Sequence, residues 1–470
     1  MLNAVQKTSW YLFVFLLPWQ TAWVFHEVFV GGEKWQYATG LLFVSDIALA
    51  ISAVALLLGA GHDLFRRVIR DGVFWAFASL FILSLCSEMW AARPDMAMEA
   101  SGRLLVLLAV YLVARFGGVS VRWTVVVFIV AMGFHAIFAV SQWDGQYVSS
   151  PKWLGISEHD PAQPGTAVVK SDSGRYLRAY GGFEHPNVFA GALAWAAIAG
   201  LFVIARERNG VVRAFLLASL PILMLALAVS FSRTGWVMFS VGVMAFGALS
   251  LMRRFGFGAD RGTAARTVLA GFLAFFALGA FLLMLRSVTG DRFSTETIGR
   301  EGSISDREAY MRQAVFAIRK NPIFGVGAGN FTAFSLRVFP EAGSFIGAFQ
   351  PVHVVPVLVF AELGIVGFAL FAFALAYGFA RAWAERNLLV VVGLSALVPS
   401  LLLDHWLWTG HFGTALLGMI LGLSARGSEA SRDSGEENQP GVEMPEARIS
   451  SRYSKWALST VWSRVFLRRG

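Results

Sequence analysis

Residues 305–329 read SDREAYMRQAVFAIRKNPIFGVGAG, and residues 351–367 read PVHVVPVLVFAELGIVG. The first segment opens with the capping box SDRE, continues with apolar residues at helical spacing and stops at Pro322. The second segment begins a long apolar run with His353 at its head. A polar helix, a glycine-rich turn and a histidine-headed apolar helix together predict a helical protein whose functional part lies at a membrane surface.

The composition is that of an integral membrane protein. Of the 470 residues, 56% are hydrophobic and only 15% are charged, whereas about a quarter would be charged in a soluble domain. The one cysteine, Cys86, excludes an internal disulfide framework. Lys7 before an apolar segment resembles a signal sequence, but Pro18 and Trp19 stand where small residues would allow cleavage. We therefore interpret this segment as a retained first span.

Twelve apolar runs have the length needed to cross a bilayer, which is about 20 residues with some tolerance. This pattern predicts an all-α polytopic membrane protein with about 12 transmembrane helices, which form a membrane domain over residues 1–424. The runs lie near residues 8–25, 39–59, 73–91, 101–116, 121–142, 186–205, 213–230, 234–252, 266–286, 352–380, 388–403 and 407–424.

The loop charges orient these spans. With a cytoplasmic N-terminus, every short inner loop is basic, as the positive-inside rule requires, and both termini lie in the cytoplasm. Two outer segments, residues 142–185 and 287–351, are too long to be simple connections and are expected to carry function as periplasmic loops. The second segment contains the amphipathic helix that begins near residue 305, and it is expected to form part of the active site. The multi-pass chain is therefore expected to present its site on the outer face.

Residues 425–470 form a cytoplasmic tail. Its first half, up to Arg448, is rich in Glu, Ser, Pro and Gly and is expected to be disordered. Beyond it, Tyr453, Trp456 and Val461 fall on one helical face beside several arginines, a pattern typical of a basic amphipathic helix on an anionic membrane surface. An unstructured basic tail is the alternative.

Two arginines stand on the expected outer side, where the charge bias disfavours them. Arg233 lies in the tight turn between the seventh and eighth spans, and Arg307 lies in the first turn of the outer helix, on its packing face. Because a guanidinium can grip a phosphate bidentately, we interpret both as ligands of an anion. The alternatives are snorkelling to lipid headgroups for Arg233 and pairing with a neighbouring acid for Arg307.

His353 is expected at the outer end of the tenth span, between two prolines, where its usual pKa near 6.5 suits a general base. The alternative is an interfacial cap. Glu362 follows nine residues later, on the opposite helical face and about 13 Å deeper, so we interpret it as a buried structural acid. Asp46 and His135 are further intramembrane candidates without an assigned role.

Two further turns could support an anion site. Arg178 and His185 precede Pro186, which suits an early helical position. Asp404 opens a polar and aromatic turn that either lines a sugar-binding mouth or belongs to an aromatic belt. The sequence has no Asp-x-Asp pair, Walker loop, HExxH motif or cysteine cluster, so neither a metal nor a cofactor is expected.

These motifs together resemble the O-antigen ligase family, within the wider group of O-antigen ligases, polymerases and protein O-oligosaccharyltransferases. The resemblance rests on GFEHPN at residues 182–187, the Ser232 and Arg233 turn, the helix and glycines of residues 307–327, the segment from His353 to Gly367 and DHWLWT at residues 404–409.

The resemblance implies a metal-independent, inverting glycosyltransferase in lipopolysaccharide assembly at the bacterial inner membrane. It would transfer O-antigen glycan from undecaprenyl diphosphate to a hydroxyl of the lipid A core on the periplasmic face. The family's essential histidine falls on His353 and its two essential arginines fall on Arg233 and Arg307. Arg178, His185 and Asp404 would be supporting residues. No nucleic acid is implied.

Two alternatives stay open. An O-antigen polymerase or a protein O-oligosaccharyltransferase would use the same donor with another acceptor. A lipid-linked oligosaccharide flippase or exporter would also need an arginine-lined cavity, although the long outer loops and the one-sided placement of the candidate residues favour surface chemistry.

Overall fold

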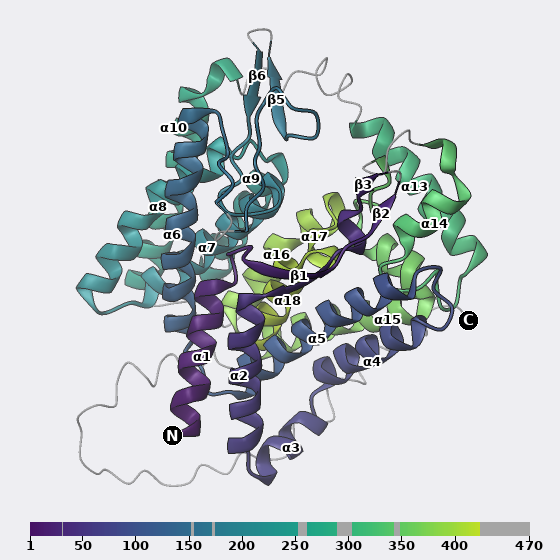
Figure 1. Cartoon of the computed structure of the whole chain (residues 1–470). Helices are drawn as coiled ribbons and strands as arrows, with labels where there is room; N and C mark the ends of the chain where they lie inside the picture. Colours follow the sequence, from purple (N-terminus) through teal and green to yellow (C-terminus); the bar gives the residue numbers. More distant parts are fainter. Residues whose placement is uncertain are drawn as a thin grey trace, which may run out of the picture. The chain divides into compact units, whose positions relative to one another are not determined.

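In the computed structural model, most of the chain is helical (Figure 1). The structure describes residues 1–30, 32–151, 155–171, 174–251, 261–288, 303–342 and 348–423. These belong to one unit, Met1–Ala430. The expected tail, residues 425–470, lies outside the described residues. The helices are α1 (Leu2–Leu16), α2 (Val44–Gly59), α3 (His62–Ile69), α4 (Gly72–Ser87), α5 (Pro94–Phe116), α6 (Val121–Gly145), α7 (Pro186–Arg206), α8 (Gly210–Val229), α9 (Arg233–Leu251), α10 (Arg261–Met284), α13 (Ser303–Lys320), α14 (Phe331–Val338), α15 (Val355–Ala384), α16 (Leu388–Leu403), α17 (Trp406–Thr409) and α18 (His411–Gly422).

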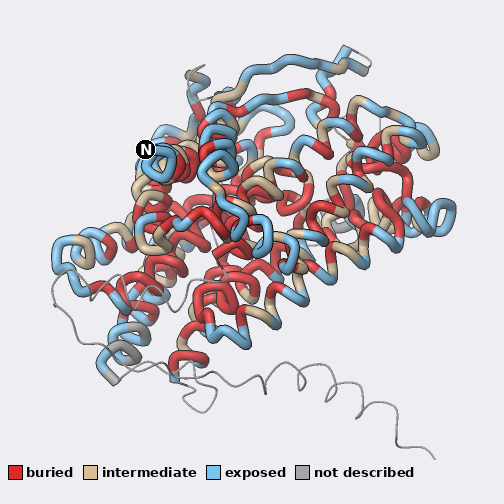
Figure 2. The backbone as a smooth tube through the Cα atoms, turned by 90° about the horizontal axis from the view of Figure 1, so that it is seen from below, coloured by how far each residue is buried: buried red, intermediate tan, exposed pale blue. Residues whose placement is uncertain are grey.

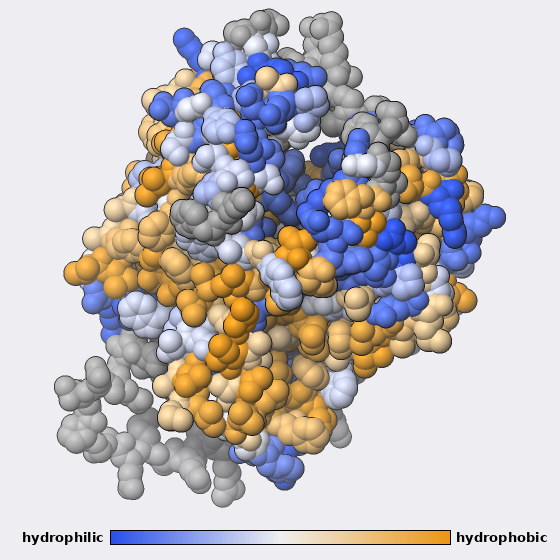
Figure 3. Space-filling view, viewed as in Figure 1, coloured by the Kyte–Doolittle hydropathy of each residue, from blue (hydrophilic) through white to orange (hydrophobic). Residues whose placement is uncertain are grey.

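The helices form a membrane protein. Among the described residues, six helices are long and apolar enough to cross a bilayer: α5, α6, α7, α8, α9 and α15. The pair α2 and α3, bent by 112°, counts as a seventh if it is one span, and four shorter apolar helices accompany them. In Figure 3, hydrophobic side chains cover the middle of the visible face, and hydrophilic side chains gather above it around β5 and β6 and below it near α3.

The first predicted span is partly wrong. Residues 8–25 do not form one helix, because α1 ends at Leu16 and residues Ala22–His26 form a strand. Pro18 explains the difference, since proline cannot continue a helix and restricts the residue before it. Each of the other eleven runs contains a helix, with boundaries shifted by a few residues, and the last run is divided at Gly410 into α17 and α18.

The centre of the bundle is α7, whose apolar window is buried along its whole length. It packs against α6, α8, α9, α10 and α16. On the other side of the unit, α5 packs against α4 and α18, and α4 packs against α15. Figure 2 shows the buried segments gathered inside and the exposed segments around them. Helices hydrophobic on all sides, such as α7, are expected in such a position.

Three small antiparallel hairpins modify the all-α prediction. They pair β1 (Ala22–His26) with β4 (Gly40–Phe43), β2 (Phe29–Val30) with β3 (Glu33–Lys34), and β5 (Val168–Ser171) with β6 (Gly174–Leu177). The last hairpin lies within the first long loop. These strands are two to five residues long, so they give little period-two signal beside the apolar spans.

Helix α13 and the turn after it, up to Gly329, pack on α15, and we call this segment the strap. Helix α13 begins at Ser303, two residues before the capping box predicts, and ends at Lys320 as expected. The following turn then hydrogen bonds to α15: the Gly327 N–H donates to the Glu362 carbonyl at 2.9 Å, and the Ile365 N–H donates to the Pro322 carbonyl at 2.9 Å. These bonds join the turn after α13 to the N-terminal part of α15.

The strap requires a break in α15, and the break occurs at Gly364, where φ is 67°. The residues around it give their backbone groups to the turn instead of to the helix. Pro356 is not at the break but at the start of the helix, as one of its first residues. A side chain at Gly364 would overlap the Ile323 carbonyl. The close contact between the two backbone segments and the left-handed φ therefore both require glycine at this position.

We predict that Gly364→Ala lowers the free energy of unfolding by more than about 2 kcal/mol, because it adds a left-handed penalty and a backbone clash. Thermal unfolding of the purified protein in detergent measures this loss. Gly133→Ala in α6 is the control, since a Cβ there meets nothing within 4 Å. Equal stability of the two variants would show that the strap is dispensable.

Candidate functional site

A half-buried amide joins three segments of the chain. Asn187, in the first turn of α7, donates from Nδ2 to Asp404 Oδ2 at 2.8 Å. Its Oδ1 accepts from Arg178 at 2.6 Å and from Ser232 Oγ at 3.0 Å. The His185 ring caps the same helix, accepting the Asn187 N–H at 3.1 Å through Nδ1. The turns that carry four of the predicted site regions therefore meet at one side chain.

The predicted general base lies beside this network. The His353 ring stacks on Tyr310 of α13 at 6.0 Å between centroids and contacts His405 edge to face at 4.9 Å. His405 is held through Nδ1 by Thr409 at 2.7 Å, and its backbone N–H donates to Asp404 Oδ1 at 2.8 Å. Among the described residues, the enclosed Nδ1 of His353 has no hydrogen-bond partner. Packing against Tyr310 and His405 therefore helps to position its ring.

The surroundings keep His353 neutral. Burial, followed by the neighbouring His405, lowers the pKa of His353 well below its usual value of 6.5, and the Arg307 guanidinium acts in the same direction. Burial opposes ionisation of Asp404, but the imidazoles of His405, His353 and His185 hold the pKa of this carboxyl below its ordinary range. A neutral imidazole can accept a proton.

The two predicted anion ligands, Arg307 and Arg233, belong to different helices, α13 and α9. Arg307 is an exposed residue in the early part of α13, close enough to act electrostatically on both His353 and His405. Arg233 is half-buried at the start of α9, directly after the Ser232 that bonds Asn187. The turn before it is tight, as predicted, because α8 ends at Val229, but Arg233 is the first residue of α9 and not part of the turn. Arg307 thus acts on the histidine cluster, and Arg233 directly follows the serine that joins the Asn187 network.

Glu362 has the structural surroundings that the sequence predicts. It is buried at the break of α15, where its carboxylate accepts the Trp408 indole N–H at 2.8 Å. The backbone N–H groups of Gly329 and Phe331 also donate to it. Trp406 and Trp408 are both buried, so this aromatic turn faces protein rather than lipid. The two remaining intramembrane candidates also have partners. Asp46 pairs with His411 at 2.6 Å, and His135 packs against Trp19.

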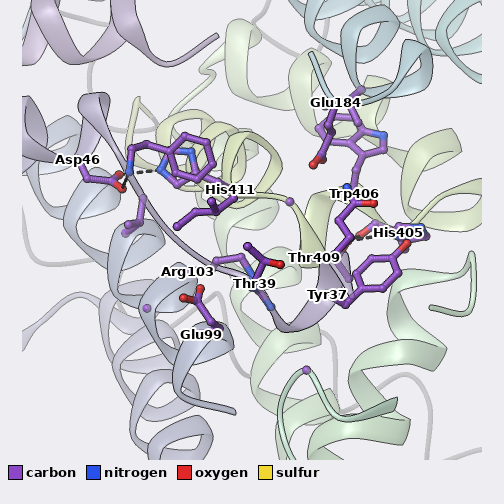
Figure 4. Close-up of a pocket in the computed structure, with 18 of the residues that line it drawn as sticks. Tyr37, Thr39, Asp46, Glu99, Arg103, Glu184, His405, Trp406, Thr409 and His411 are labelled. Atoms are coloured by element: carbon purple, nitrogen blue, oxygen red, sulfur yellow. Dashed lines mark hydrogen bonds and ion pairs between the residues drawn. The ribbon is translucent and has the colours of Figure 1, made fainter. Parts of the chain in front are cut away.

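A cavity of about 1010 Å³ opens beside the cluster. His185, His353, Asp404 and His405 line one part of it, and it extends into a groove between α2 and α5. Figure 4 shows Glu184, Trp406, Thr409 and His405 on one side of the pocket, with Arg103 and Glu99 facing it from α5. No set of three His, Cys, Asp or Glu side chains in the described part of the chain is arranged to hold a metal ion.

Several of these residues escape the sequence analysis. Glu99 and Arg103 are one helical turn apart in α5, and the run predicted at 101–116 begins too late to include Glu99. Charged residues within an apolar helix are a signal of function that could have identified both. Asn187, interpreted as part of a helix start, gives no local sign that Asp404 is its partner.

The middle of the chain is similar to a known protein family. Residues 214–372 match the family described as O-antigen ligase. The chain carries an O-antigen ligase domain. The resemblance inferred from the motifs is thereby confirmed. No curated protein matches the chain at a significant level.

The O-antigen ligase domain contains Arg233, Arg307 and His353, whereas Arg178, His185 and Asp404 lie outside the matched residues. The family supports a glycosyl-transferring enzyme of the O-antigen ligase or polymerase type that acts in membrane glycan assembly. Its substrates are expected to be lipid-linked glycans, and the bilayer is its environment.

We predict that Asn187→Ala lowers the free energy of unfolding by about 1–3 kcal/mol, because Arg178 and Asp404 lose a buried hydrogen-bond partner. Thermal unfolding in detergent measures the change. Asn3→Ala, at an exposed position of α1, serves as the control and should be neutral. An unchanged midpoint for Asn187→Ala would contradict a joining role for this amide.

Proposed function

We propose that the protein is a metal-independent, inverting O-antigen ligase. It would transfer glycan from an undecaprenyl-diphosphate carrier to a sugar hydroxyl of the lipid A core during lipopolysaccharide assembly. One observation carries the proposal: a neutral histidine, His353, lines a large cavity, and the Arg307 guanidinium is close enough to lower its pKa. This combination supplies a base for the acceptor and a cation for the leaving group.

The arginines would act on the donor. Arg233 and Arg307 are proposed to hold the diphosphate, whose negative charge increases as the glycosidic bond breaks. Guanidinium groups that lie where charge develops stabilise the transition state more than the ground state. Arg178, held by Asn187 and the Ser230 carbonyl, would support the same end of the site. This charge neutralisation needs no metal ion.

The base would act on the acceptor. As the acceptor oxygen attacks the anomeric carbon, its proton passes to the His353 imidazole. The bond between that carbon and the diphosphate oxygen breaks, and its electron pair leaves with undecaprenyl diphosphate. Attack opposite the leaving group inverts the anomeric configuration. His185 and Asp404 would support this geometry. Asp404 accepts the backbone N–H of His405, and the His405 ring contacts the base.

The proposed topology has twelve spans in the bacterial inner membrane, with both termini in the cytoplasm and the active site facing the periplasm. The basic inner loops support this orientation. The histidine cluster, α13 and the β5–β6 hairpin all belong to the segments assigned to the outer face.

Other acceptors define the second candidate. An O-antigen polymerase or protein O-oligosaccharyltransferase would use the same donor end of the site. Mass analysis of the glycan in a deletion strain distinguishes them, because the glycan would be lost from the lipid A core, from protein or only from long chains. A flippase would leave the donor intact after incubation with acceptor.

We predict that His353→Ala reduces transfer by about 10²–10⁴-fold, the usual contribution of a general base. The measurement is glycan transfer by purified protein in vesicles containing undecaprenyl-diphosphate-linked donor and lipopolysaccharide without O-antigen. His62→Ala, at an exposed position of α3, is the matched control and should retain full activity. Full transfer by His353→Ala would remove the proposed mechanism.

A second prediction concerns pH. Because burial and neighbouring cations lower the pKa of His353, the base stays deprotonated as the pH falls through 6.5. The profile of kcat/KM, which reports the free enzyme, should therefore stay level from pH 8 to about 6 and fall only below that. Arg307→Gln removes one of the depressing charges and should move the acidic limb upward.

Arg312→Gln is the control for this shift, since Arg312 lies on the same helix and pairs with Glu308 on the exposed surface at 3.8 Å. It should leave the acidic limb in place. A wild-type profile with its midpoint at pH 6.5 or above would contradict the assignment of a buried imidazole as the base.

A further inference from the structure

The cavity continues away from His353 into a groove with a different character. On α2, Asp46 is followed at helical spacing by Leu49, Ala53 and Leu57, which all line the cavity. On α5, Glu99 and Arg103 are followed in the same way by Val106 and Ala109. Both helices therefore place polar groups at the end nearer their N-termini and apolar groups further along. The groove is amphipathic along its length.

The cavity that contains this groove is rich in carboxyl groups. Five carboxylates line the described cavity, those of Asp46, Glu99, Glu184, Glu362 and Asp404, whereas Arg103 is the one arginine among its lining residues. A diphosphate would be repelled by such a surface, and sugar hydroxyls, which donate hydrogen bonds, would be attracted. The charge pattern thus separates an acceptor side from the arginines proposed to bind the donor.

Arg103 is not satisfied by its neighbours. Glu99, Glu184 and Glu362 act on it electrostatically, yet among the described residues it forms no ion pair within 4.0 Å, and its enclosed Nε has no hydrogen-bond partner. Glu99 in turn accepts the Leu41 backbone N–H. An enclosed guanidinium nitrogen without a hydrogen-bond partner is costly, so a ligand with an anionic or hydroxyl group beside the half-buried Arg103 would be stabilising.

The apolar end is open to the membrane. Val54 is 53% exposed, Leu57 is 56% exposed and Leu105 is 50% exposed, and all three line the cavity. Leu57 follows Asp46 by eleven positions, so the two lie about 16 Å apart along the helix axis. The groove is therefore long enough for the hydrocarbon chain of a lipid to lie along α2 and α5 while the headgroup of the same lipid reaches the polar end.

We infer that the α2–α5 groove binds the acceptor, a lipid-anchored sugar, with its headgroup between Glu99, Arg103 and Glu184 and its acyl chain along Ala53 and Val106. The inference rests on the proposed glycosyl transfer and assigns one of its two substrates to a site. The carboxylates receive sugar hydroxyls, Arg103 receives an acidic substituent, and the continuity of the cavity delivers an acceptor hydroxyl to His353.

The test separates the two substrates by their KM values, using the full chain in vesicles with undecaprenyl-diphosphate-linked glycan as donor and lipopolysaccharide without O-antigen as acceptor. Ala53→Trp fills the apolar end, and Arg103→Gln alters the polar end. Each should raise the KM for acceptor about tenfold or more, the effect of losing the burial of roughly two methylene groups or one charged contact, while the donor KM changes less than about twofold.

Leu58→Trp is the matched control, because Leu58 follows the groove residue Leu57 on α2 but is 70% exposed and does not line the cavity. It should leave both KM values unchanged. Thermal unfolding of each variant in detergent checks that the protein is intact. A raised donor KM in Ala53→Trp would overturn the inference by placing the polyprenyl chain in the groove, and so would unchanged values for both substrates.

Direct binding keeps the inference distinct from the proposed function. Native mass spectrometry measures lipopolysaccharide without O-antigen bound to wild type and Ala53→Trp in nanodiscs. If wild type transfers no glycan but binds this lipid and Ala53→Trp does not, the proposed function fails and the groove assignment stands. Equal binding by both proteins would overturn the groove assignment whatever the activity.

Discussion

A short set of backbone hydrogen bonds between the turn Pro322–Gly327 and the break in α15 positions much of the proposed site. The Gly327 N–H and the Ile365 N–H each reach across from one segment to the other at 2.9 Å. These contacts fix α13, which carries Arg307 and Tyr310, against α15, whose N-terminal end carries His353. The break at Gly364 makes the exchange possible, since an intact helix would keep its amide groups for itself.

The second constraint is electrostatic. Both a cation, Arg307, and a carboxylate, Asp404, act on His353, and further carboxyl groups line the cavity. A diphosphate and a sugar hydroxyl have opposite requirements, so we propose that each substrate approaches the base from a different part of the cavity. Burial keeps the imidazole neutral, and packing against Tyr310 and His405 keeps it in place. Proximity of two oriented substrates then supplies much of the rate.

The sequence predicts the parts of this arrangement that depend on local pattern. Apolar length identifies the spans, Pro186 identifies the start of α7, and Asn321 with Pro322 identifies the end of α13. The bond between Asn187 and Asp404 joins residues 217 positions apart, and no local pattern contains it. The break at Gly364 is equally hidden, because glycine within an apolar helix is common in membranes. Arg103 was overlooked although a charge inside an apolar helix is informative.

The most direct test of the account is a structure of the protein with undecaprenyl-diphosphate-linked glycan bound. We expect the diphosphate to contact the guanidinium groups of Arg233 and Arg307, with the anomeric carbon facing His353 and the acidic α2–α5 groove left for the acceptor. A diphosphate bound among Glu99, Glu184 and Arg103 instead, or one that touches neither Arg233 nor Arg307, would contradict the account.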